Sequence, residues 1–354
     1  MKKNFLITTG GSGGHVIPAL ILYEHLSKEE NVIITSDIRG LKYLDDEFYK
    51  CKIINTPRLD NIFLLPYNMI KIIILTLKSL FLLKNKKVEK IFSTGGYMSL
   101  PLILAGKILK LEIFLLEPNQ VLGRANKYFL SSCKKIFCYN KKIINFPKNL
   151  LNKMVIINPL VRENIYKLKS SGSIKDKFTI LIVGGSQSAS IFNMNLKNSI
   201  VNISNKKPIK IIQQTNKENV SYLKDFYSKN NIENKIFNFE NNFENIIKDV
   251  DLCITRSGAS TLAELSVINI PFIAVPLPTS KDNHQLENAN FYKENDCCWV
   301  IEQTNFEKKI EHLLSEILTD KIDYLKKKEN LKKLNYQNTW INVNQKILEI
   351  INEN

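Results

Sequence analysis

The chain of 354 residues is too long for one ordinary hydrophobic core and fits two domains of typical size. Its 44% hydrophobic and 24% charged residues exclude a disordered or fibrous protein. The net charge of +16 would suit nucleic acid, an anionic membrane or an acidic ligand, although Lys, Asn and Ile are used heavily throughout. No arginine-rich patch interleaved with aromatic residues is present, which argues against nucleic-acid binding.

Strand-like and helix-like segments alternate through the first half of the chain. Predicted strands are residues 3–9, 32–35, 51–54, 90–94, 112–116, 135–138 and 155–157. A helix is predicted over residues 16–26, where Pro18 is tolerated in the first turn. Strands separated by helices with short connections predict an α/β domain with a parallel, doubly wound sheet.

The second half repeats this order. Predicted strands are residues 179–183, 210–213, 235–237, 252–255 and 272–275. Residues 158–173 are polar and are predicted to form a linker, so the two domains are expected at 1–160 and 161–334. A final helix at about 335–354 could pack back on the first domain, and the sequence leaves the second domain open as well.

Residues 62–83 form an intensely apolar stretch. Two internal lysines, Lys71 and Lys78, argue against a membrane-spanning helix. Because they are seven residues apart, they are expected on one helical face with the apolar residues opposite. This pattern fits a helix lying in a membrane interface against anionic lipid. It fits equally a helix that buries a broad apolar face within its own domain.

The six cysteines show no C-x-x-C spacing, so we expect reduced and mostly buried thiols. Such thiols favour a cytosolic protein. The N-terminus enters its first predicted strand almost at once, so no signal peptide is expected.

Two glycine clusters each close a strand-like run: GGSGGH at residues 10–15 and GGSQ at residues 184–187. A strand that enters a glycine turn and leaves into a helix directs free backbone N–H groups, with the helix dipole behind them, at one point. Such a point attracts phosphate. Two of them, half a chain apart, predict two nucleotide-type domains facing each other across a cleft.

The first cluster departs from the dinucleotide-binding fingerprint. It lacks the G-x-G-x-x-G spacing, and the acidic residue expected at the end of the second strand is represented only by Asp37 in a polar segment. His15 directly follows the turn, where it could act as a general base or could simply cap or pack beneath the turn.

Residues 256–264 (RSGASTLAE) follow a predicted strand and open a helix. Ser260 and Thr261 are candidate N-caps and phosphate ligands. Glu264 could accept hydrogen bonds from two ribose hydroxyls or serve as a capping-box carboxylate. Residues 282–289 carry amide side chains suited to sugar hydroxyls.

Six motifs occur in a fixed order: GGSGGHVIP at 10–18, GGY at 95–97, EPN at 117–119, GGSQ at 184–187, RSGA at 256–259 and DNHQLENA at 282–289. Together they resemble the MurG family, the bacterial UDP-N-acetylglucosamine transferases that complete the lipid-linked peptidoglycan precursor. The resemblance spans nearly the whole chain. It implies a GT-B fold, with two Rossmann-like doubly wound parallel-sheet domains, the first for the lipid-linked acceptor and the membrane and the second for the UDP-sugar.

The resemblance also implies roles for individual residues. His15 or Glu117 would accept the proton, and Tyr97 would support the acceptor side. The residues implied to bind UDP-N-acetylglucosamine are Ser12, Gly13, Gly14, Asn119, Arg162, Ser186, Glu240, Ala259, Ser260, Thr261, Leu262, Ala263, Glu264, Gln285 and Asn288. At Glu240 the contact would run through the backbone.

Four departures from the family pattern affect these assignments. Ser12 stands where many members have Thr, which keeps the hydroxyl. Leu116 and Pro118 stand where His and Gln are usual, and Ser188 replaces a glycine. Residues 158–162 hold one residue more than the usual N-P-V-R, so the position of Arg162 depends on where the extra residue lies.

The implied reaction is an inverting, single-displacement transfer. The C4 hydroxyl of undecaprenyl-pyrophosphoryl-N-acetylmuramyl-pentapeptide would attack the anomeric carbon of UDP-N-acetylglucosamine, converting lipid I to lipid II. No D-x-D pair sits at a strand end, so neither a metal ion nor another cofactor is expected; helix N-termini and Arg162 would stabilise the leaving UDP. Expected partners are an anionic membrane surface, at the cytoplasmic face of the inner membrane, and other proteins of cell-wall synthesis.

Three alternatives remain. Another GT-B enzyme could transfer a sugar from a UDP-sugar to a different membrane lipid such as a diacylglycerol, and competition between UDP-glucose and UDP-N-acetylglucosamine would separate the two. A nicotinamide-dependent oxidoreductase is disfavoured by the second glycine cluster. A non-catalytic basic binding module would have no use for ordered glycine motifs.

Overall fold

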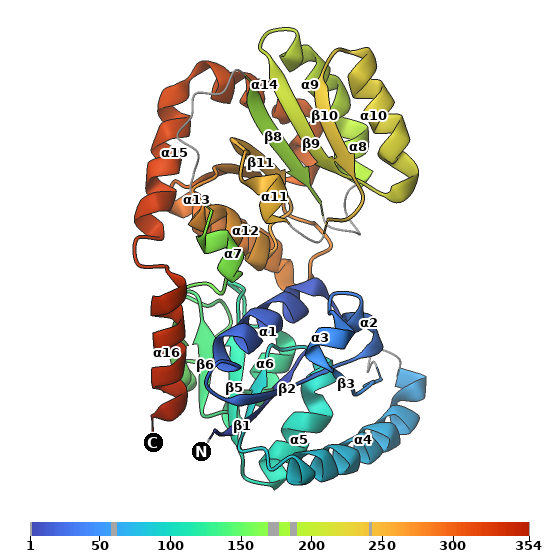
Figure 1. Cartoon of the computed structure of the whole chain (residues 1–354), viewed down its shortest axis with the longest axis vertical. Coiled ribbons are helices and arrows are strands. Elements are labelled where there is room, and N and C mark those ends of the chain that lie inside the picture. The colour runs from blue at the N-terminus through green and yellow to red at the C-terminus, as the bar shows by residue number, and fades with distance from the viewer. Residues whose placement is uncertain (1, 58–61, 169–176, 185–189, 241–242, 354) are drawn as a thin grey trace. The chain divides into compact units, whose positions relative to one another are not determined.

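The computed structural model describes residues 2–57, 62–168, 177–184, 190–240 and 243–353 (Figure 1). By contacts within the chain it divides into two compact units. Unit 1 comprises Met1–Val161 and Thr339–Asn354, and unit 2 comprises Arg162–Asn338.

Unit 1 is built on a seven-stranded parallel sheet with the order β3-β2-β1-β4-β5-β6-β7. The strands are β1 (Asn4–Thr8), β2 (Asn31–Ser36), β3 (Lys52–Ile53), β4 (Lys90–Ser93), β5 (Glu112–Glu117), β6 (Lys135–Cys138) and β7 (Met154–Ile156). Phe5, Leu6 and Ile7 of the interior strand β1 are fully buried because helices cover both faces of the sheet. The strand order reverses between β1 and β4, where ligands bind in open α/β sheets.

Two hydrophobic cores lie on the two faces of this sheet. One is formed with α1 (Gly13–Leu26) and α16 (Trp340–Asn352), and the other with the end of α4 (Leu65–Asn85) and with α5 (Leu100–Ile108). The remaining helices are α2 (Ile38–Leu41), α3 (Asp46–Tyr49), α6 (Arg124–Phe129), η1 (Ile62–Leu64), η2 (Tyr97–Ser99), η3 (Leu130–Ser132) and η4 (Lys148–Lys153).

The C-terminal helix α16 packs on unit 1, one of the two positions that the sequence leaves open. The ring of Trp340 stacks on His25 of α1 with centroids 3.6 Å apart. At the other end of the helix, Lys134 Nζ donates to the carbonyl of Glu353 at 2.7 Å. A cation at a helix C-terminus is favoured by the helix dipole, so both ends of α16 are anchored.

Unit 2 is built on a six-stranded parallel sheet with the order β10-β9-β8-β11-β12-β13. The strands are β8 (Phe178–Val183), β9 (Ile209–Gln214), β10 (Glu233–Phe237), β11 (Leu252–Thr255), β12 (Phe272–Ala274) and β13 (Cys298–Val300). The helices are α7 (Glu163–Tyr166), α8 (Ser190–Asn195), α9 (Lys197–Ser204), α10 (Val220–Lys229), α11 (Glu244–Ile247), α12 (Ala259–Val267), α13 (His284–Glu294), α14 (Phe306–Thr319), α15 (Lys321–Leu334), η5 (Lys217–Asn219), η6 (Lys281–Asn283) and η7 (Gln303–Asn305).

The predicted linker at residues 158–173 is partly wrong. Leu160, Val161 and Ile165 are at most 1% exposed, and the short helix α7 follows Arg162. The polar residues of this segment led to the prediction of a linker, but its apolar side chains are buried and hold its first part in place. Residues 169–176 lie outside the described residues.

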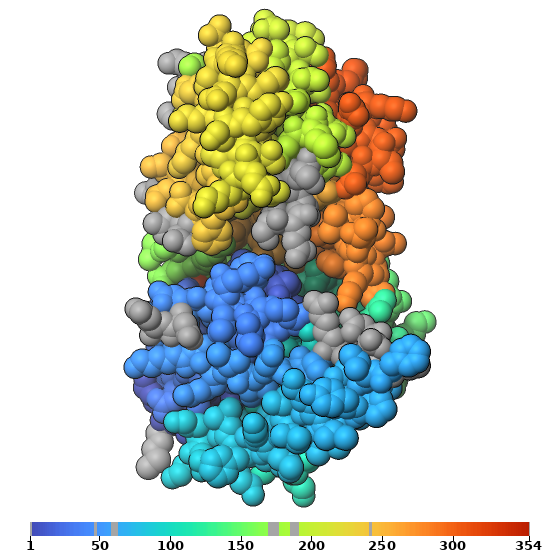
Figure 2. All heavy atoms as spheres, turned by 90° about the vertical axis from the view of Figure 1, so that its right-hand side faces the viewer, coloured from blue at the N-terminus to red at the C-terminus, as the bar shows by residue number. Residues whose placement is uncertain are grey.

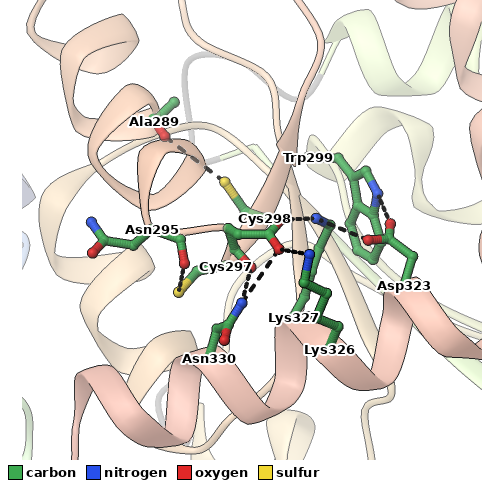
Figure 3. A network of polar contacts seen from close by, with 10 residues as sticks. Ala289, Asn295, Cys297, Cys298, Trp299, Asp323, Lys326, Lys327 and Asn330 are labelled. Carbon is green, nitrogen blue, oxygen red and sulfur yellow. Dashed lines mark hydrogen bonds and ion pairs between the residues drawn. The ribbon is translucent and has the colours of Figure 1, made fainter.

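A charged cluster joins α15 to the turn before β13, the edge strand that the sequence did not predict (Figure 3). Lys327 is buried and places Nζ 2.7 Å from Asp296 and 3.3 Å from Asp323, beneath the ring of Trp299 at 5.0 Å. Lys326 and Lys327 hold the pKa of the Asp296 carboxyl below its usual value. A buried lysine needs such partners, so the cluster fixes α15 against the sheet.

Candidate functional site

The glycine turn of unit 1 joins β1 to α1 and requires glycine at two positions. Gly10 and Gly11 have φ of +144° and +79°, values that favour glycine. A Cβ on Gly10 would lie 2.5 Å from Oδ1 of Asp37. Ser12 is the N-cap of α1 but makes no side-chain capping hydrogen bond. The first backbone N–H groups of the helix are therefore not satisfied by a side-chain cap.

Asp37 holds this turn in place from the end of β2. Its fully buried carboxylate accepts hydrogen bonds through Oδ1 from the backbone N–H of Gly11 at 2.7 Å and of Gly40 at 3.0 Å. Both Nε and Nη2 of Arg39 donate to Oδ2, at 2.9 and 2.5 Å. In a dinucleotide-binding protein, an acidic residue here would bind a ribose hydroxyl. In this chain Asp37 is instead bonded to the glycine turn and to Arg39.

Arg39 was not predicted, although a D-x-R sequence at the end of a strand is a usable signal. Its guanidinium donates to the hydroxyl of Tyr97 and lies 5.2 Å from the centre of that ring. The structure therefore links the predicted residue Tyr97 to the glycine turn through Arg39 and Asp37.

His15 lies in the first turn of α1 and packs against a second glycine pair. Its Nδ1 is 2.8 Å from the carbonyl of Thr94, which can only accept a hydrogen bond. Nδ1 must carry the proton, so Nε2 is the basic nitrogen of the neutral ring. Gly95 and Gly96 have φ of +88° and +84°, and a Cβ on Gly95 would stand 3.4 Å from the imidazole.

Glu117 ends β5 and is only 2% exposed. Its Oε1 accepts from the backbone and side-chain nitrogens of Asn119, at 3.2 and 3.1 Å. Its Oε2 accepts from the backbone of Gly123 at 2.7 Å and from Nδ2 of Asn126 at 2.9 Å. These four bonds use the carboxylate to join the loop at residues 118–123 to the first turn of α6, and Asn126 of that helix is a partner that the sequence did not reveal.

In unit 2, α12 begins at Ala259 with Gly258 as its N-cap and no side-chain capping hydrogen bond. The prediction that Ser260 and Thr261 are N-caps is wrong, because both lie inside the first turn. Leu262 and Ala263 are at most 1% exposed, so only their backbone could meet a ligand. A Cβ on Gly258 would meet no atom within 4 Å, which leaves space before the helix.

The structure brings Arg162 and Glu264 together. Nε of Arg162 lies 3.0 Å from Oε1 of Glu264, but Oε1 makes no hydrogen bond with the described residues. Burial raises the pKa of Glu264, and the charge of Arg162 opposes that rise. Because Glu264 lies six residues after the N-cap Gly258, and a capping box needs its carboxylate at the third, the capping-box alternative is wrong. An unsatisfied buried oxygen of this kind calls for a donor from a ligand or water.

Gln285 and Asn288 of α13 tie two strand ends together. Oε1 of Gln285 accepts from the backbone N–H of Ser257 at 3.2 Å and of Leu277 at 3.0 Å. Nδ2 of Asn288 donates to the carbonyl of Ser257 at 3.1 Å. Arg256, which is 7% exposed, donates to the carbonyls of Val275 and Pro276 and to Gln303, and burial lowers its pKa. Arg256 therefore holds the loops at these strand ends.

Two predicted donor-binding residues remain, Glu240 and Ser186, and the structure describes only the first. Glu240 follows β10 and its carboxylate lies 3.9 Å from Lys235, a weak and partly exposed pair. Ser186, like the unusual Ser188, lies outside the described residues. No cluster of His, Cys, Asp and Glu able to hold a metal ion occurs among the residues that the structure describes.

Replacing Glu117 by Gln tests its role as the organiser of the loop. The amide NH2 would face an existing donor and two charge-assisted hydrogen bonds would be lost, so we expect the free energy of unfolding to fall by about 2 kcal/mol in urea titrations. Glu89→Gln, at an exposed carboxylate of the same unit, should change it by less than about 0.5 kcal/mol. Equal effects of the two substitutions would contradict the assignment.

The comparisons with known proteins agree along the whole chain. The model of the glycosyltransferase family 28 N-terminal domain matches residues 5–138, and that of the C-terminal domain matches residues 179–339. A relative from Pelagibacter ubique is 47% identical over 100% of both chains, and one from Rickettsia canadensis is 39% identical over 86% of this chain and 87% of its own. Both are named UDP-N-acetylglucosamine–N-acetylmuramyl-(pentapeptide) pyrophosphoryl-undecaprenol N-acetylglucosamine transferase.

The fold comparison gives the same result. The crystal structure of MurG from Acinetobacter baumannii superposes with a TM-score of 0.78 at 22% identity, covering 99% of each chain. The predicted fold, two doubly wound parallel-sheet domains of the GT-B type, is confirmed. The chain belongs to glycosyltransferase family 28, and within it to the MurG family of N-acetylglucosamine transferases.

Proposed function

We propose that the protein transfers N-acetylglucosamine from UDP-N-acetylglucosamine to the C4 hydroxyl of undecaprenyl-pyrophosphoryl-N-acetylmuramyl-pentapeptide, with inversion at the anomeric carbon. The full-length identity of 47% with the Pelagibacter ubique transferase carries this proposal. Each unit adds local support, since each offers a strand-to-helix turn whose helix lacks a side-chain cap.

Unit 2 is the proposed site of the UDP-sugar. The first-turn N–H groups of α12 suit the donor diphosphate, and Arg162 adds a cation. The unsatisfied carboxylate oxygen of Glu264 suits a ribose hydroxyl, which would supply the missing hydrogen bond. These groups would also stabilise the negative charge that develops on UDP as its bond to the sugar breaks.

Unit 1 is the proposed site of the acceptor, and His15 is its proposed base. Nε2 of the neutral ring would take the C4 hydroxyl proton while that oxygen attacks the anomeric carbon. Glu117 is the weaker candidate, because its two oxygens already accept four hydrogen bonds.

Helix α4 is the proposed membrane contact, and it has an inverted amphipathic pattern. Its buried residues include the polar Asn68, Thr76 and Ser79. Its exposed residues are mainly apolar: Leu65, Tyr67, Met69, Ile70, Ile73, Ile74, Leu77 and Phe81 are each at least 38% exposed, and Phe63 and Leu64 just before it are 91% and 51% exposed. Figure 2 shows this segment in light blue on the surface of unit 1.

The lysines of α4 lie beside this apolar face. At about 100° per residue, Lys71 and Lys78 fall between the exposed and the buried faces, not opposite the apolar residues as the sequence pattern suggested. Cations at the rim of an apolar stripe are placed to reach anionic headgroups. Among the described residues α4 is the one helix long and apolar enough to cross a membrane, with 22% of its apolar window buried. We propose that it lies in the cytoplasmic interface of the inner membrane.

The reaction itself can be tested with purified protein, UDP-N-acetylglucosamine and a short-chain lipid-linked muramyl-pentapeptide. We expect transfer of radiolabelled sugar to the acceptor, and tenfold excess of unlabelled UDP-glucose should compete poorly. Efficient transfer from UDP-glucose to diacylglycerol instead would establish the alternative, another GT-B transferase acting on a membrane lipid.

His15→Ala should lower kcat by at least about a hundredfold, because positioned proton transfer contributes that much to rate. The affinity for UDP-N-acetylglucosamine, measured by calorimetry, should stay within about threefold. Undiminished kcat in this variant would remove His15 as the base.

Membrane binding can be measured by co-sedimentation with vesicles containing phosphatidylglycerol. A triple substitution of Ile70, Leu77 and Phe81 by Ser should abolish sedimentation, because three exposed apolar side chains would no longer enter the interface. The matched control replaces the exposed Ile322, Leu325 and Tyr336 of unit 2 by Ser and should sediment like the wild type. Equal binding by both variants would contradict the role of α4.

A further inference from the structure

The outer edge of β13 in unit 2 borders a groove that takes no part in the proposed reaction. A cavity of about 730 Å³ lies there, lined by β13, the end of α13, one face of α14 and Lys327 of α15. None of its lining residues is among those proposed to bind the donor or the acceptor. We propose that this groove binds an extended, acidic segment of a partner protein. Such binding is independent of the proposed transfer reaction.

The backbone of β13 leaves hydrogen-bonding groups unpaired on one side. β13 ends the six-stranded sheet, and among the described strands it pairs with β12 alone. Ile301, just after β13, donates its N–H to the carbonyl of Ala274 in β12 at 3.0 Å. Because alternate residues of a strand direct their N–H and C=O groups to opposite edges, those of Cys298 and Val300 face away from β12. An added strand would satisfy both these donors and these acceptors.

The charges around the groove are mainly positive and partly uncompensated. Four lysines and one histidine line it, against two acidic residues. Both acidic residues already have partners, since Asp296 lies 2.7 Å from Nζ of Lys327 and Glu316 lies 3.2 Å from Nδ1 of His312. The remaining lysines are exposed and form no ion pair with the described residues: Lys293, Lys308 and Lys309. This excess of cations favours a ligand rich in carboxylates.

Two of these lysines stand where a helix disfavours cations. Lys308 and Lys309 lie at the start of α14, near the positive end of the helix dipole. With His312, Leu313 and Glu316 they recur at four-residue intervals, so one face of α14 lines the groove. Carboxylates bound beside Lys308 and Lys309 would offset the repulsion between the lysines and the dipole. Leu313, on the same face, suits an aliphatic side chain of the ligand.

Helix α15 holds β13 in a fixed position (Figure 3). Asp323 of α15 accepts from Nε1 of Trp299 at 2.9 Å, and Asn330 donates to the carbonyl of Asp296 at 3.0 Å. The ring of Trp299 also packs against the hydrophobic core of unit 2. A strand that is already ordered loses little conformational entropy when a ligand pairs with it.

An acidic peptide fits this groove better than a free polyanion or a second copy of the chain. A free polyanion would contact the lysines but leave the outward carbonyls of the edge unpaired. A second copy, with a net charge of +16, would bring like charge to the lysines. Lysines beside an exposed edge also repel cationic strands and stay unpaired against neutral ones. They therefore select acidic strands.

Fluorescence anisotropy with a labelled octapeptide of alternating Glu and Val tests the role of the lysines. We expect saturable binding to the whole protein that weakens with added salt. The test variant carries three substitutions, Lys293→Gln, Lys308→Gln and Lys309→Gln, and should bind about tenfold more weakly, the loss expected for three exposed ion pairs. The matched control removes three exposed lysines elsewhere in unit 2, Lys206→Gln, Lys224→Gln and Lys229→Gln, and should bind within about twofold of the wild type.

The role of the strand edge is tested separately. Val300→Pro removes an outward N–H but keeps the groups of Trp299 and Ile301 that face β12, so it should weaken binding roughly fivefold, the loss of about one hydrogen bond. Val300→Ala keeps that N–H and should bind like the wild type. The same octapeptide with every backbone nitrogen methylated keeps its charges, loses its donors and should bind poorly to the wild type. The methylated peptide decides the point even if Val300→Pro melts at a lower temperature.

Four outcomes would overturn the proposal. The wild type fails to bind the octapeptide, or the test variant and its matched control bind it equally. The methylated peptide binds as tightly as the original, which would leave charge alone and no strand pairing. Inorganic triphosphate binds as tightly as the octapeptide through the same lysines, which would make the groove a site for a free polyanion. Light scattering shows a dimer of the wild type that the test variant does not form, which would place a second copy on the edge.

Discussion

A single buried carboxylate sets the geometry of the proposed acceptor side. Asp37 has no contact with solvent, and its charge is held by the backbone N–H groups of Gly11 and Gly40 and by Arg39. The glycine turn cannot adopt its positive φ values against this carboxylate with any larger residue at position 10, because a Cβ would overlap Oδ1. Sequence, backbone conformation and buried charge therefore depend on one another. The positions of Ser12 and His15 follow from that turn.

Unit 2 reaches a similar result with different chemistry. There the strand ends are held by a neutral amide, Gln285, and by the buried cation of Arg256, which between them bond the backbone of both loops. These polar side chains are used internally and do not cap α12, whose start has no side-chain capping hydrogen bond and is the proposed diphosphate site. In unit 2 the side chains that hold the loops are distinct from those proposed above to bind the UDP-sugar. Motifs in the sequence contain both kinds and do not separate them.

Local patterns in the sequence were sufficient for the fold and insufficient for parts of the site. Buried parallel strands are continuous apolar runs, so β6 and β11 were predicted to the residue and doubly wound parallel sheets followed, whereas the GT-B class was implied by the family resemblance. β13 has three residues and no periodicity to detect. The N-cap of α12 is Gly258 and not one of the hydroxyl residues that were predicted. Arg39 contacts Tyr97 and Asn126 contacts Glu117, and folding brings these partners together. The hydrogen bonds of His15 and Glu117, which the sequence does not reveal, are the reason for proposing His15 rather than Glu117 as the base.

Helix α4 is a further case in which the sequence was insufficient. Its apolar composition was clear from the sequence, but the face that it exposes was not. Apolar residues normally face the core, and that rule would bury Ile70, Leu77 and Phe81. The structure instead buries Thr76 and Ser79, and Thr76 satisfies its hydroxyl on the carbonyl of Ile72 at 2.8 Å. Exposing three such side chains to water costs roughly 5 kcal/mol in lost burial, a large part of the stability of a typical domain. Burial of these side chains in the apolar part of a membrane interface would recover that free energy. The inverted pattern is therefore stronger evidence for a membrane surface than the hydrophobicity of the segment alone.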